Sequence, residues 1–407
     1  MISEKMKQMI GSSSAIRAMF EEGKRLAAER GADKVYDFSL GNPNIAPPAQ
    51  VTEAAEKELR ECKGVFLHGY MSNAGYDDVR EKIASSLNAR FGMNYGKDGI
   101  VMTVGAAGGL NVVLKSLLDP GDEVAVISPY FGEYRCYVSN FGGKLVEAAA
   151  DKDFMPDPAA IEKALSPKTR ALIINTPNNP TGAVYGENAL KAIARVLEEA
   201  QSKYGAPIYL ISDEPYRELV YGGVTQPYVA GYYRNTLSCY SFSKSLSLAG
   251  ERIGYIAVSP DADGYDELCS ACSVATRILG FVNAPSLMQR VAADCIDVPP
   301  DVAFYDSNRV AFEKALDDAG LEYVKPQGAF YLFVKAPDGD DLLFCQRAKD
   351  KGILIVPSSS FGVKGYARAA YCVSPERVSS SAAAFAELAE EYGIKKRAGV
   401  DKTHKGE

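Results

Sequence analysis

Apolar and polar positions along the chain alternate between short apolar runs and longer amphipathic segments. The apolar runs predict strands at residues 100–103, 123–127, 144–148, 171–174, 207–211, 236–240 and 252–258. Amphipathic segments predict helices at residues 110–118, 158–165 and 187–203. Strands that alternate with helices are typical of a doubly wound α/β sheet, which binds ligands at the carboxyl ends of its strands.

The two ends of the chain follow a different pattern. The N-terminal part predicts a helix at 16–26, a short strand at 35–38, a turn at 40–44, and helices at 50–62 and 77–91. In the turn, Gly41 would let the backbone approach a ligand closely. From about residue 300 the pattern predicts a helix, strands at 329–334 and 353–356, and a last helix at 375–392, which together form a smaller domain.

The composition argues against several classes of protein. The 407 residues carry a net charge of −7 with no basic stripe, so the chain lacks the cations that nucleic-acid binding requires. The N-terminus has no apolar core of a signal peptide, and no stretch approaches the ~20 apolar residues of a membrane span. We therefore expect a cytoplasmic protein.

Histidine and cysteine usage narrows the chemistry further. The only histidines are His68 and His404, so the chain has few candidates for the catalytic histidine that mechanisms such as Ser-His-Asp hydrolysis need. Eight cysteines are scattered, mostly in apolar runs, which favours reduced core thiols over a disulfide framework. Cys269 and Cys272 form a single CxxC pair, for which two packed thiols are a better interpretation than a zinc site. A lysine-centred mechanism fits this composition better.

Polar side chains follow three of the predicted strands at the point where each strand ends. These are Asn179 after the strand at 171–174, Asp213 and Tyr216 after the strand at 207–211, and Ser241, Ser243 and Lys244 after the strand at 236–240. Because strand ends in α/β sheets are where ligands dock, we expect these side chains to lie close together.

A phosphate site is predicted beside them. The small-residue loop at 104–109 opens a helix, and its bare N–H groups at the positive end of the helix dipole suit a phosphate. Its spacing is not GxGxxG, so a dinucleotide site is weakly supported. Arg252 follows Lys244 by eight residues and, with the serine hydroxyls, could hold the same phosphate.

This set of side chains matches what pyridoxal 5'-phosphate requires. Its aldehyde needs a lysine, and its phosphate needs N–H donors and a cation. Its ring needs an aromatic face such as Phe131, and its pyridine nitrogen needs a carboxylate such as Asp213. The sequence supplies each partner.

At this point the chain resembles the class I/II aminotransferases, the fold type I pyridoxal-phosphate enzymes of the aspartate aminotransferase superfamily, over essentially its whole length. The matching motifs are Asn179-Pro180-Thr181-Gly182, Asp213-Glu214-Pro215-Tyr216, Ser241-Phe242-Ser243-Lys244 and Arg252-Ile253-Gly254-Tyr255. The resemblance implies an α/β fold with a three-layer α/β/α large domain, a mainly parallel seven-stranded sheet and a smaller α+β domain. It assigns residues 1–48 to an N-terminal arm and part of the small domain, 49–298 to the large cofactor-binding domain and 299–407 to the C-terminal small domain.

The resemblance also implies roles for single residues around the cofactor ring. Lys244 resembles the lysine that forms the aldimine with the cofactor and then moves the proton between the substrate α-carbon and the cofactor. Asp213 resembles the partner of the pyridine nitrogen, and Phe131 the stacking aromatic. Asn179 and Tyr216 resemble the pair that hydrogen-bonds the phenolic oxygen.

Further residues resemble the phosphate and substrate contacts of the family. The phosphate cup would consist of Gly105, Ala106, Ala107, Ser241, Ser243 and Arg252, with Tyr70 reaching it from a neighbouring subunit. Family members often have polar side chains at the positions of Ala106 and Ala107, so this cup would depend more on backbone donors. Arg368 resembles the arginine that binds the substrate α-carboxylate, beside Gly41 and Asn179. A homodimer with shared active sites is implied.

The implied activity is a pyridoxal-phosphate-dependent transaminase that moves an amino group from an L-amino acid to a 2-oxo acid in ping-pong fashion. A lyase or decarboxylase on the same fold is the alternative. A Rossmann-type oxidoreductase and a non-enzymatic regulator have less support, since the GxGxxG motif and an N-terminal basic domain are missing.

The identity of the substrate stays open at this point. An acidic substrate would need a second cation, and Arg277 lies near the region from which some relatives present one. Arg277 is displaced by about one residue from the position of the cation in those relatives, which favours a charge on the surface of a helix over a substrate contact.

Overall fold

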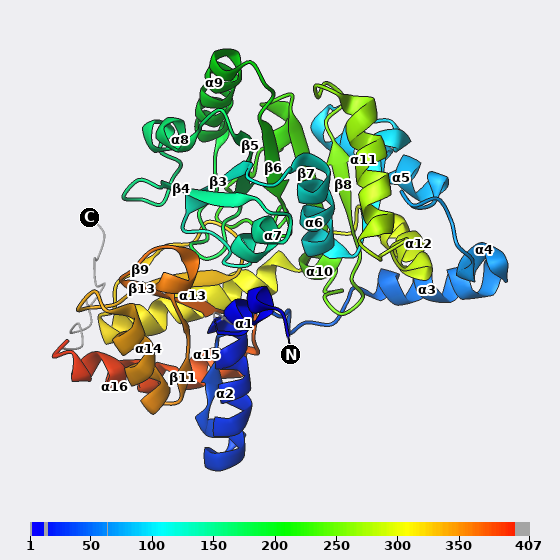
Figure 1. Ribbon diagram of the computed structural model, residues 1–407. Helices are drawn as coiled ribbons and strands as arrows, with labels where there is room; N and C mark the ends of the chain where they lie inside the picture. Colours follow the sequence, from blue (N-terminus) through cyan, green and yellow to red (C-terminus); the bar gives the residue numbers. More distant parts are fainter. Residues whose placement is uncertain (1, 12–14, 63, 395–407) are drawn as a thin grey trace, which may run out of the picture.

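The computed structural model describes residues 2–11, 15–62 and 64–394 (Figure 1). Its largest sheet has seven strands in the order β2-β8-β7-β6-β5-β3-β4. The strands are β2 (Ile100–Thr103), β3 (Glu123–Ser128), β4 (Lys144–Ala149), β5 (Thr169–Asn175), β6 (Tyr209–Asp213), β7 (Thr236–Ser241) and β8 (Gly254–Val258). The strand β8 runs antiparallel to both of its neighbours, β2 and β7, and all other neighbouring strands are parallel. The mainly parallel seven-stranded sheet is confirmed.

Helices cover both faces of this sheet because apolar side chains point alternately to either side of each strand. Ile173 and Ile211 belong to a core cluster with α6 (Gly105–Leu117), α7 (Tyr134–Asn140) and α11 (Tyr265–Ile278). Their neighbours Leu172 and Leu210 face the opposite way, toward α8 (Pro158–Ala164) and α9 (Glu187–Tyr204). Two further helices, α5 (Asp77–Phe91) and α12 (Ser286–Asp294), pack on the β2 end of the sheet.

A second, smaller lobe lies below the sheet in Figure 1. Its antiparallel sheet has the order β12-β13-β10-β9, formed by β9 (Tyr323–Val324), β10 (Tyr331–Lys335), β12 (Val356–Pro357) and β13 (Tyr366–Ala370). The helices α13 (Val302–Ala319), α14 (Asp341–Asp350), α15 (Pro375–Ser380) and α16 (Ala382–Glu391) complete it. Near the N-terminus, β1 (Tyr36–Asp37) pairs with β11 (Ile353–Leu354), and Phe38 belongs to the core of the smaller lobe. The domain boundaries at residues 48 and 298 stay a prediction.

The remaining helices are α1 (Glu4–Gly11), α2 (Ala15–Arg30), α3 (Ala49–Glu61), α4 (Val65–His68) and α10 (Phe242–Ser245). The helix α1 was not predicted, and α2 is longer than the expected helix at 16–26. The tail after residue 394, which includes His404, lies outside the described residues. Among the described residues, no helix combines the length and the apolar character needed to cross a bilayer.

Three predicted elements have different bounds in the structure. The small-residue loop at 104–109 forms the first turns of α6, where the small residues let the helix pack closely on the sheet: a Cβ on Gly109 would lie 3.4 Å from the side chain of Ile256. The run at 353–356 splits into β11 and β12, which belong to different sheets. The last helix is divided at Ser381, whose hydroxyl donates a hydrogen bond to the carbonyl of Val378.

Candidate active site

The predicted site residues converge on one pocket of about 890 Å³ at the carboxyl ends of β5, β6 and β7. Twelve of the fourteen predicted residues line it: Gly41, Ala106, Ala107, Phe131, Asn179, Asp213, Tyr216, Ser241, Ser243, Lys244, Arg252 and Arg368. The two that do not are Gly105 and Tyr70. Parallel strands therefore bring together side chains that are far apart in the sequence, as expected.

Lys244 lies on α10, the short helix that follows β7. The hydroxyl of Ser241 caps this helix by accepting the N–H of Ser243 at 3.3 Å. The Lys244 ammonium donates a hydrogen bond to the carbonyl of Gly41. Burial, with the positive charges of Arg368 and Arg252, lowers the pKa of Lys244 to about 8. About one tenth of this amine is therefore neutral at pH 7, far more than for an ordinary lysine, and able to act as a nucleophile or a base.

Asp213 is the last residue of β6 and is only 6% exposed. The buried hydroxyl of Tyr134 donates to its Oδ2 at 2.5 Å, while Oδ1 has no hydrogen-bond partner. Burial raises the pKa of Asp213 to about 7, the Tyr134 hydrogen bond opposes this shift, and the charge of Glu214 adds to it. A buried carboxylate oxygen without a donor is costly, so a cationic N–H group would be well accommodated there.

The N-terminus of α6 forms an anion cradle with Arg252. No side chain caps this helix, so its first N–H groups are available beside Ala106 and Ala107. Gly105 has φ +75° and approaches Arg252 so closely that a Cβ there would lie 2.8 Å from the guanidinium. Arg252 donates to the hydroxyl of Ser243 at 3.4 Å, which in turn lies 2.8 Å from that of Ser241.

Arg368 lies on β13 at the side of the pocket that the smaller lobe forms. It is 1% exposed, and its guanidinium donates to the side-chain oxygen of Asn179 at 3.0 Å and to the carbonyl of Ser39. It lies 4.6 Å from the ring centroid of Tyr331. Over residues 2–11, 15–62 and 64–394, no carboxylate forms an ion pair with Arg368, and its Nε has no hydrogen-bond partner. A buried cation without an anion is unfavourable, and a carboxylate ligand would relieve this cost.

Amide and phenol groups hold the rest of the pocket in place. Asn175, the last residue of β5, donates to the backbone carbonyl of Asp213 at 2.8 Å and accepts the N–H of Asn179 at 2.7 Å. The hydroxyl groups of Tyr216 and Tyr331 lie 2.7 Å apart. Asn179 and Tyr216 line the same pocket. Their side chains form hydrogen bonds with Arg368 and Tyr331, respectively.

These residues fit pyridoxal phosphate. The free Oδ1 of Asp213 suits the protonated ring nitrogen, and the uncapped N-terminus of α6 with Arg252 suits the phosphate. In the same pocket, Lys244 supplies an amine with a lowered pKa, and Phe131 supplies an aromatic face. The described part of the chain has no group of three or more His, Cys, Asp or Glu side chains that could hold a metal ion.

Four residues singled out in the sequence, Tyr70, Arg277, Cys269 and Cys272, do not line this pocket. Tyr70 is 92% exposed, and Arg277 is exposed on α11. Neither lines the site of its own chain. Cys269 and Cys272 are free thiols on α11, and Cys272 is fully buried.

Sequence reasoning missed several residues of the site. Tyr134 lies three residues after Phe131, so its spacing was the available signal. Asn175 stands at the end of a predicted strand, as Asp213 nearly does. Tyr331 from the smaller lobe and Met6 and Met9 from α1 also line the pocket, and no motif marked them.

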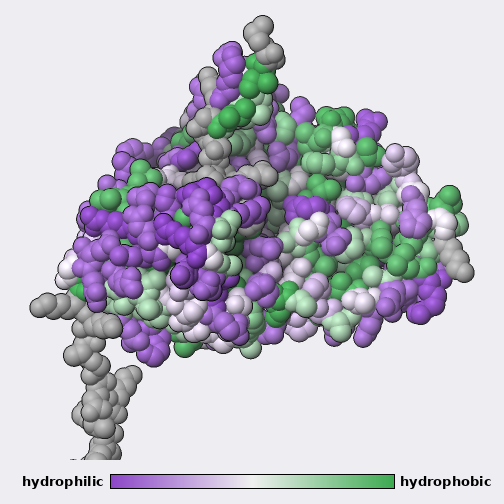
Figure 2. All heavy atoms as spheres, turned by 90° about the horizontal axis from the view of Figure 1, so that it is seen from below, coloured by the Kyte–Doolittle hydropathy of each residue, from purple (hydrophilic) through white to green (hydrophobic). Residues whose placement is uncertain are grey.

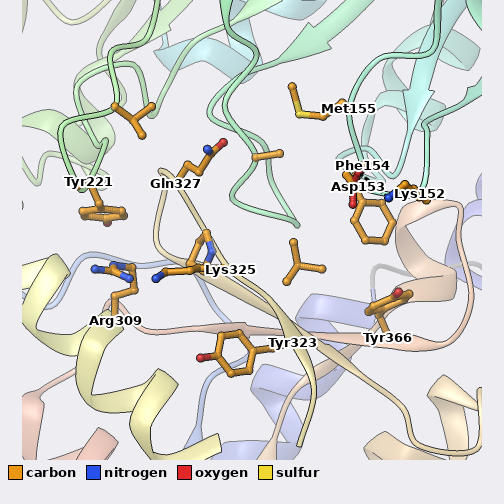
Figure 3. Close-up of a pocket in the computed structure, with 15 residues that line it drawn as sticks. Lys152, Asp153, Phe154, Met155, Tyr221, Arg309, Tyr323, Lys325, Gln327 and Tyr366 are labelled. Atoms are coloured by element: carbon orange, nitrogen blue, oxygen red, sulfur yellow. Dashed lines mark ion pairs between the residues drawn. The ribbon is translucent and has the colours of Figure 1, made fainter. Parts of the chain in front are cut away.

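A second cavity of about 720 Å³ lies between the loop after β4 and the smaller lobe (Figure 3). Lys152, Phe154 and Tyr366 stand on one side, and Tyr221, Arg309 and Lys325 on the other. Phe154 contacts Phe333 and Tyr366 edge-to-face at 5.5 and 5.2 Å between ring centroids. The aromatic contacts of Phe154 join the two lobes. None of the predicted site residues lines this cavity, so it is separate from the candidate active site.

Comparisons with known proteins agree with this geometry. Residues 33–385 match the family model "Aminotransferase class I and II". The aspartate/prephenate aminotransferase of Thermus thermophilus is 31% identical over 90% of this chain and 94% of its own length. Aromatic-amino-acid aminotransferase 2 of Thermococcus litoralis is 30% identical over 90% of this chain and 92% of its own. The crystal structure of an amino transferase from Eubacterium rectale superposes with a TM-score of 0.93 and 42% identity, covering 96% of this chain and 99% of that one.

Proposed function

The chain belongs to the class I and II aminotransferases. We propose that the pocket around Lys244 binds an L-amino acid, which gives up its amino group there, and then a 2-oxo acid, which receives it. The cofactor of the chain is pyridoxal phosphate, and the chain is a transaminase. The lyase and decarboxylase alternative is not favoured by its relatives, whose names describe aminotransferases. The oxidoreductase and regulator hypotheses have no support from them either.

We assign the cofactor contacts as follows. When bound, pyridoxal phosphate supplies an aldehyde that condenses with amines and a protonated ring that withdraws electrons from the substrate α-carbon. Asp213 Oδ1 would keep the ring nitrogen protonated, and Tyr134 would hold the carboxylate in place through Oδ2. The N–H groups of Ala106 and Ala107 and the side chains of Arg252, Ser241 and Ser243 would bind the phosphate.

Lys244 is the group that we expect to move the proton. Its lowered pKa keeps a neutral amine available, and Gly41 fixes the position of the nitrogen through its carbonyl. From this position, Lys244 Nζ would take the proton from the α-carbon of the substrate and return a proton in the second half of the cycle. Tyr216 and Asn179 would orient the ring through hydrogen bonds.

The observation on which this proposal mainly rests is Arg368. Its buried guanidinium has no acidic partner in the described ranges and lines the same pocket as Lys244. The planar guanidinium could bind a carboxylate through two parallel hydrogen bonds, and an amino acid and a 2-oxo acid both carry such a carboxylate.

We also propose a cytoplasmic homodimer with shared active sites. Four exposed apolar side chains, Leu59, Val65, Phe66 and Tyr70, lie on and next to α3 and α4. Figure 2 shows green apolar side chains gathered on the right of the molecule, where Figure 1 places these helices. Such a patch is typical of a protein interface, and Tyr70 would reach the phosphate of the second copy.

The test of the proposed function compares wild type with Arg368→Gln. With the preferred amino acid, kcat/KM should fall by about 10²–10³-fold, as expected for the loss of a buried charge-assisted contact. The dissociation constant of the cofactor should change little, and stoichiometric 2-oxo acid should form in the wild type. Unchanged kcat/KM in the variant, or release of ammonia without an amino acceptor, would contradict the proposal.

The names of the relatives supply candidate substrates. Aspartate and prephenate come from the name of the Thermus protein, and aromatic amino acids from that of the Thermococcus protein. A panel of amino acids should include both groups, because the Arg368 contact recognises only the carboxylate that all of them share.

A further inference from the structure

We propose that α1 forms an apolar wall of the subsite for the substrate side chain, so that the preferred substrates carry a large, uncharged, apolar side chain. This inference rests on the proposed transaminase function and specifies its substrate class. It assigns a specificity-determining role to Met6 and Met9, which line the pocket together with Lys244 and Arg368.

The lining of the pocket separates into a polar and an apolar part. The polar part consists of the groups assigned to the cofactor and to the substrate carboxylate. The apolar part includes Met6 and Met9 of α1, Leu40 from the turn before α3, and Cys136 of α7. Methionine side chains are flexible and polarisable, so they can adapt to apolar substrates of different shape.

The charges in the pocket argue against a second carboxylate on the substrate. Lys244, Arg252 and Arg368 are the cations that line it within the described ranges, and all three already have roles. The other charged groups outside the cofactor contacts are Glu21 and Glu133, which are acidic. Among the side chains that the structure describes around the pocket, an acidic substrate group would find no cation without a role, and these carboxylates would repel it.

The helix α1 is attached to the body of the protein next to the site. Lys5 Nζ donates to the carbonyl of Ser139 at 2.6 Å. Ser139 lies in the last turn of α7, where the helix dipole favours a cation. The same helix α7 begins with Tyr134, which holds Asp213. The attachment thus holds α1 beside the pocket that Met6 and Met9 line.

The exposure of α1 is consistent with a wall that becomes covered by ligand. Met6 is 47% exposed, and Ile2 and Ile10 are 54% and 60% exposed. Exposed methionine on a pocket wall gains stability when an apolar ligand covers it. Ile10 does not line the pocket, so it offers a matched control on the same helix.

The test measures binding of unreactive acids to the cofactor-loaded enzyme by calorimetry. The probes are 4-methylpentanoate, which has an apolar chain, succinate, which has a second carboxylate, and propanoate, which has almost no side chain. We expect 4-methylpentanoate to bind about tenfold more tightly than succinate. Met6→Gln/Met9→Gln should weaken 4-methylpentanoate about tenfold and leave propanoate unchanged, and Ile10→Gln should change neither.

Other results would overturn the inference. Tighter binding of succinate than of 4-methylpentanoate would do so, and loss of that succinate binding in Arg277→Gln would show that a second copy supplies the cation. Unchanged binding of 4-methylpentanoate in the double methionine variant would also refute it. Because none of these acids has an amino group, the binding pattern can be right even if transamination is not observed, so the two proposals fail separately.

Discussion

Burial of the charged Lys244 ammonium destabilises the cofactor-free protein by an amount that can be measured. The folded-state pKa of this group, about 8, lies below the ordinary value of 10.5, so the folded protein binds fewer protons than the unfolded chain between these values. The stability of the fold should therefore rise with pH from about 8 to 10.5, and the cost of the buried charge is fully present below pH 8.

Replacing this lysine by a neutral residue should relieve that cost. We predict that Lys244→Met raises the free energy of unfolding of the cofactor-free protein by about 1–3 kcal/mol at pH 7, and that this gain shrinks as the pH approaches 10.5. Urea unfolding at several pH values measures it. The exposed Lys152 provides the control, since Lys152→Met also removes a lysine but relieves no burial. A gain that does not depend on pH would contradict the assigned cause.

Tyr134 should adjust the charge of Asp213. Its hydrogen bond lowers the pKa of that carboxyl, so Tyr134→Phe should raise the pKa above its value of about 7. Fewer molecules would then hold the ionised carboxylate at neutral pH, and the affinity for pyridoxal phosphate should fall there and recover at higher pH. A titration of cofactor affinity against pH measures this shift. Tyr137→Phe, on the same helix, retains the Tyr134 hydrogen bond and should give the wild-type profile.

At this scale, position in the sequence predicted some residues and not others. Lys244, Asp213 and Asn179 could be found because each closely follows an apolar strand. Tyr134 and Tyr331 could not be found in this way, because their roles depend on how a helix and the smaller lobe pack against the sheet. Twelve predicted residues meet in one pocket, but their individual roles stay proposals.

Among the elements, the first turn of α6 is closely constrained by its surroundings. Gly105 has φ +75°, and a Cβ there would lie 2.8 Å from Arg252 Nη2. We predict that Gly105→Ala lowers the free energy of unfolding by about 1–3 kcal/mol and weakens cofactor binding, because it strains the backbone and displaces the arginine. Thermal unfolding and cofactor titration measure both effects.

A matched variant separates backbone strain and the contact with Arg252 from a general effect of replacing glycine. A Cβ on Gly96 would meet no atom within 4 Å, and its φ is negative, so Gly96→Ala should be tolerated. If both variants behave alike, the close contact between Gly105 and Arg252 does not explain the effect.

Most elements followed from the apolar pattern, and the exceptions have physical reasons. The prediction of α5 at 77–91 matches the structure, because an amphipathic helix between turns is a local signal. The start of α6 was predicted too late, because glycine disfavours helices unless close packing on a sheet requires it. The division of 353–356 between two sheets depends on pairing with distant strands.

For the whole molecule, the exposed apolar patch near α4 is the feature that calls for a partner. We predict that Phe66→Asp, at a side chain that is 76% exposed, produces a monomer in sedimentation equilibrium and lowers activity, since Tyr70 could no longer reach a second site. Leu342→Asp, at a side chain that is 62% exposed on α14, should leave both unchanged. A wild-type protein that is monomeric at all concentrations would contradict the shared-site dimer.

The bond between the cofactor and the chain can be trapped chemically and located by mass. Purified protein is incubated with pyridoxal phosphate, reduced with borohydride and digested, and the peptides are mapped by mass. The account predicts one stable adduct, on the peptide that contains Lys244, and none on that peptide in Lys244→Ala. An adduct on a different lysine, or none in the wild type, would contradict it.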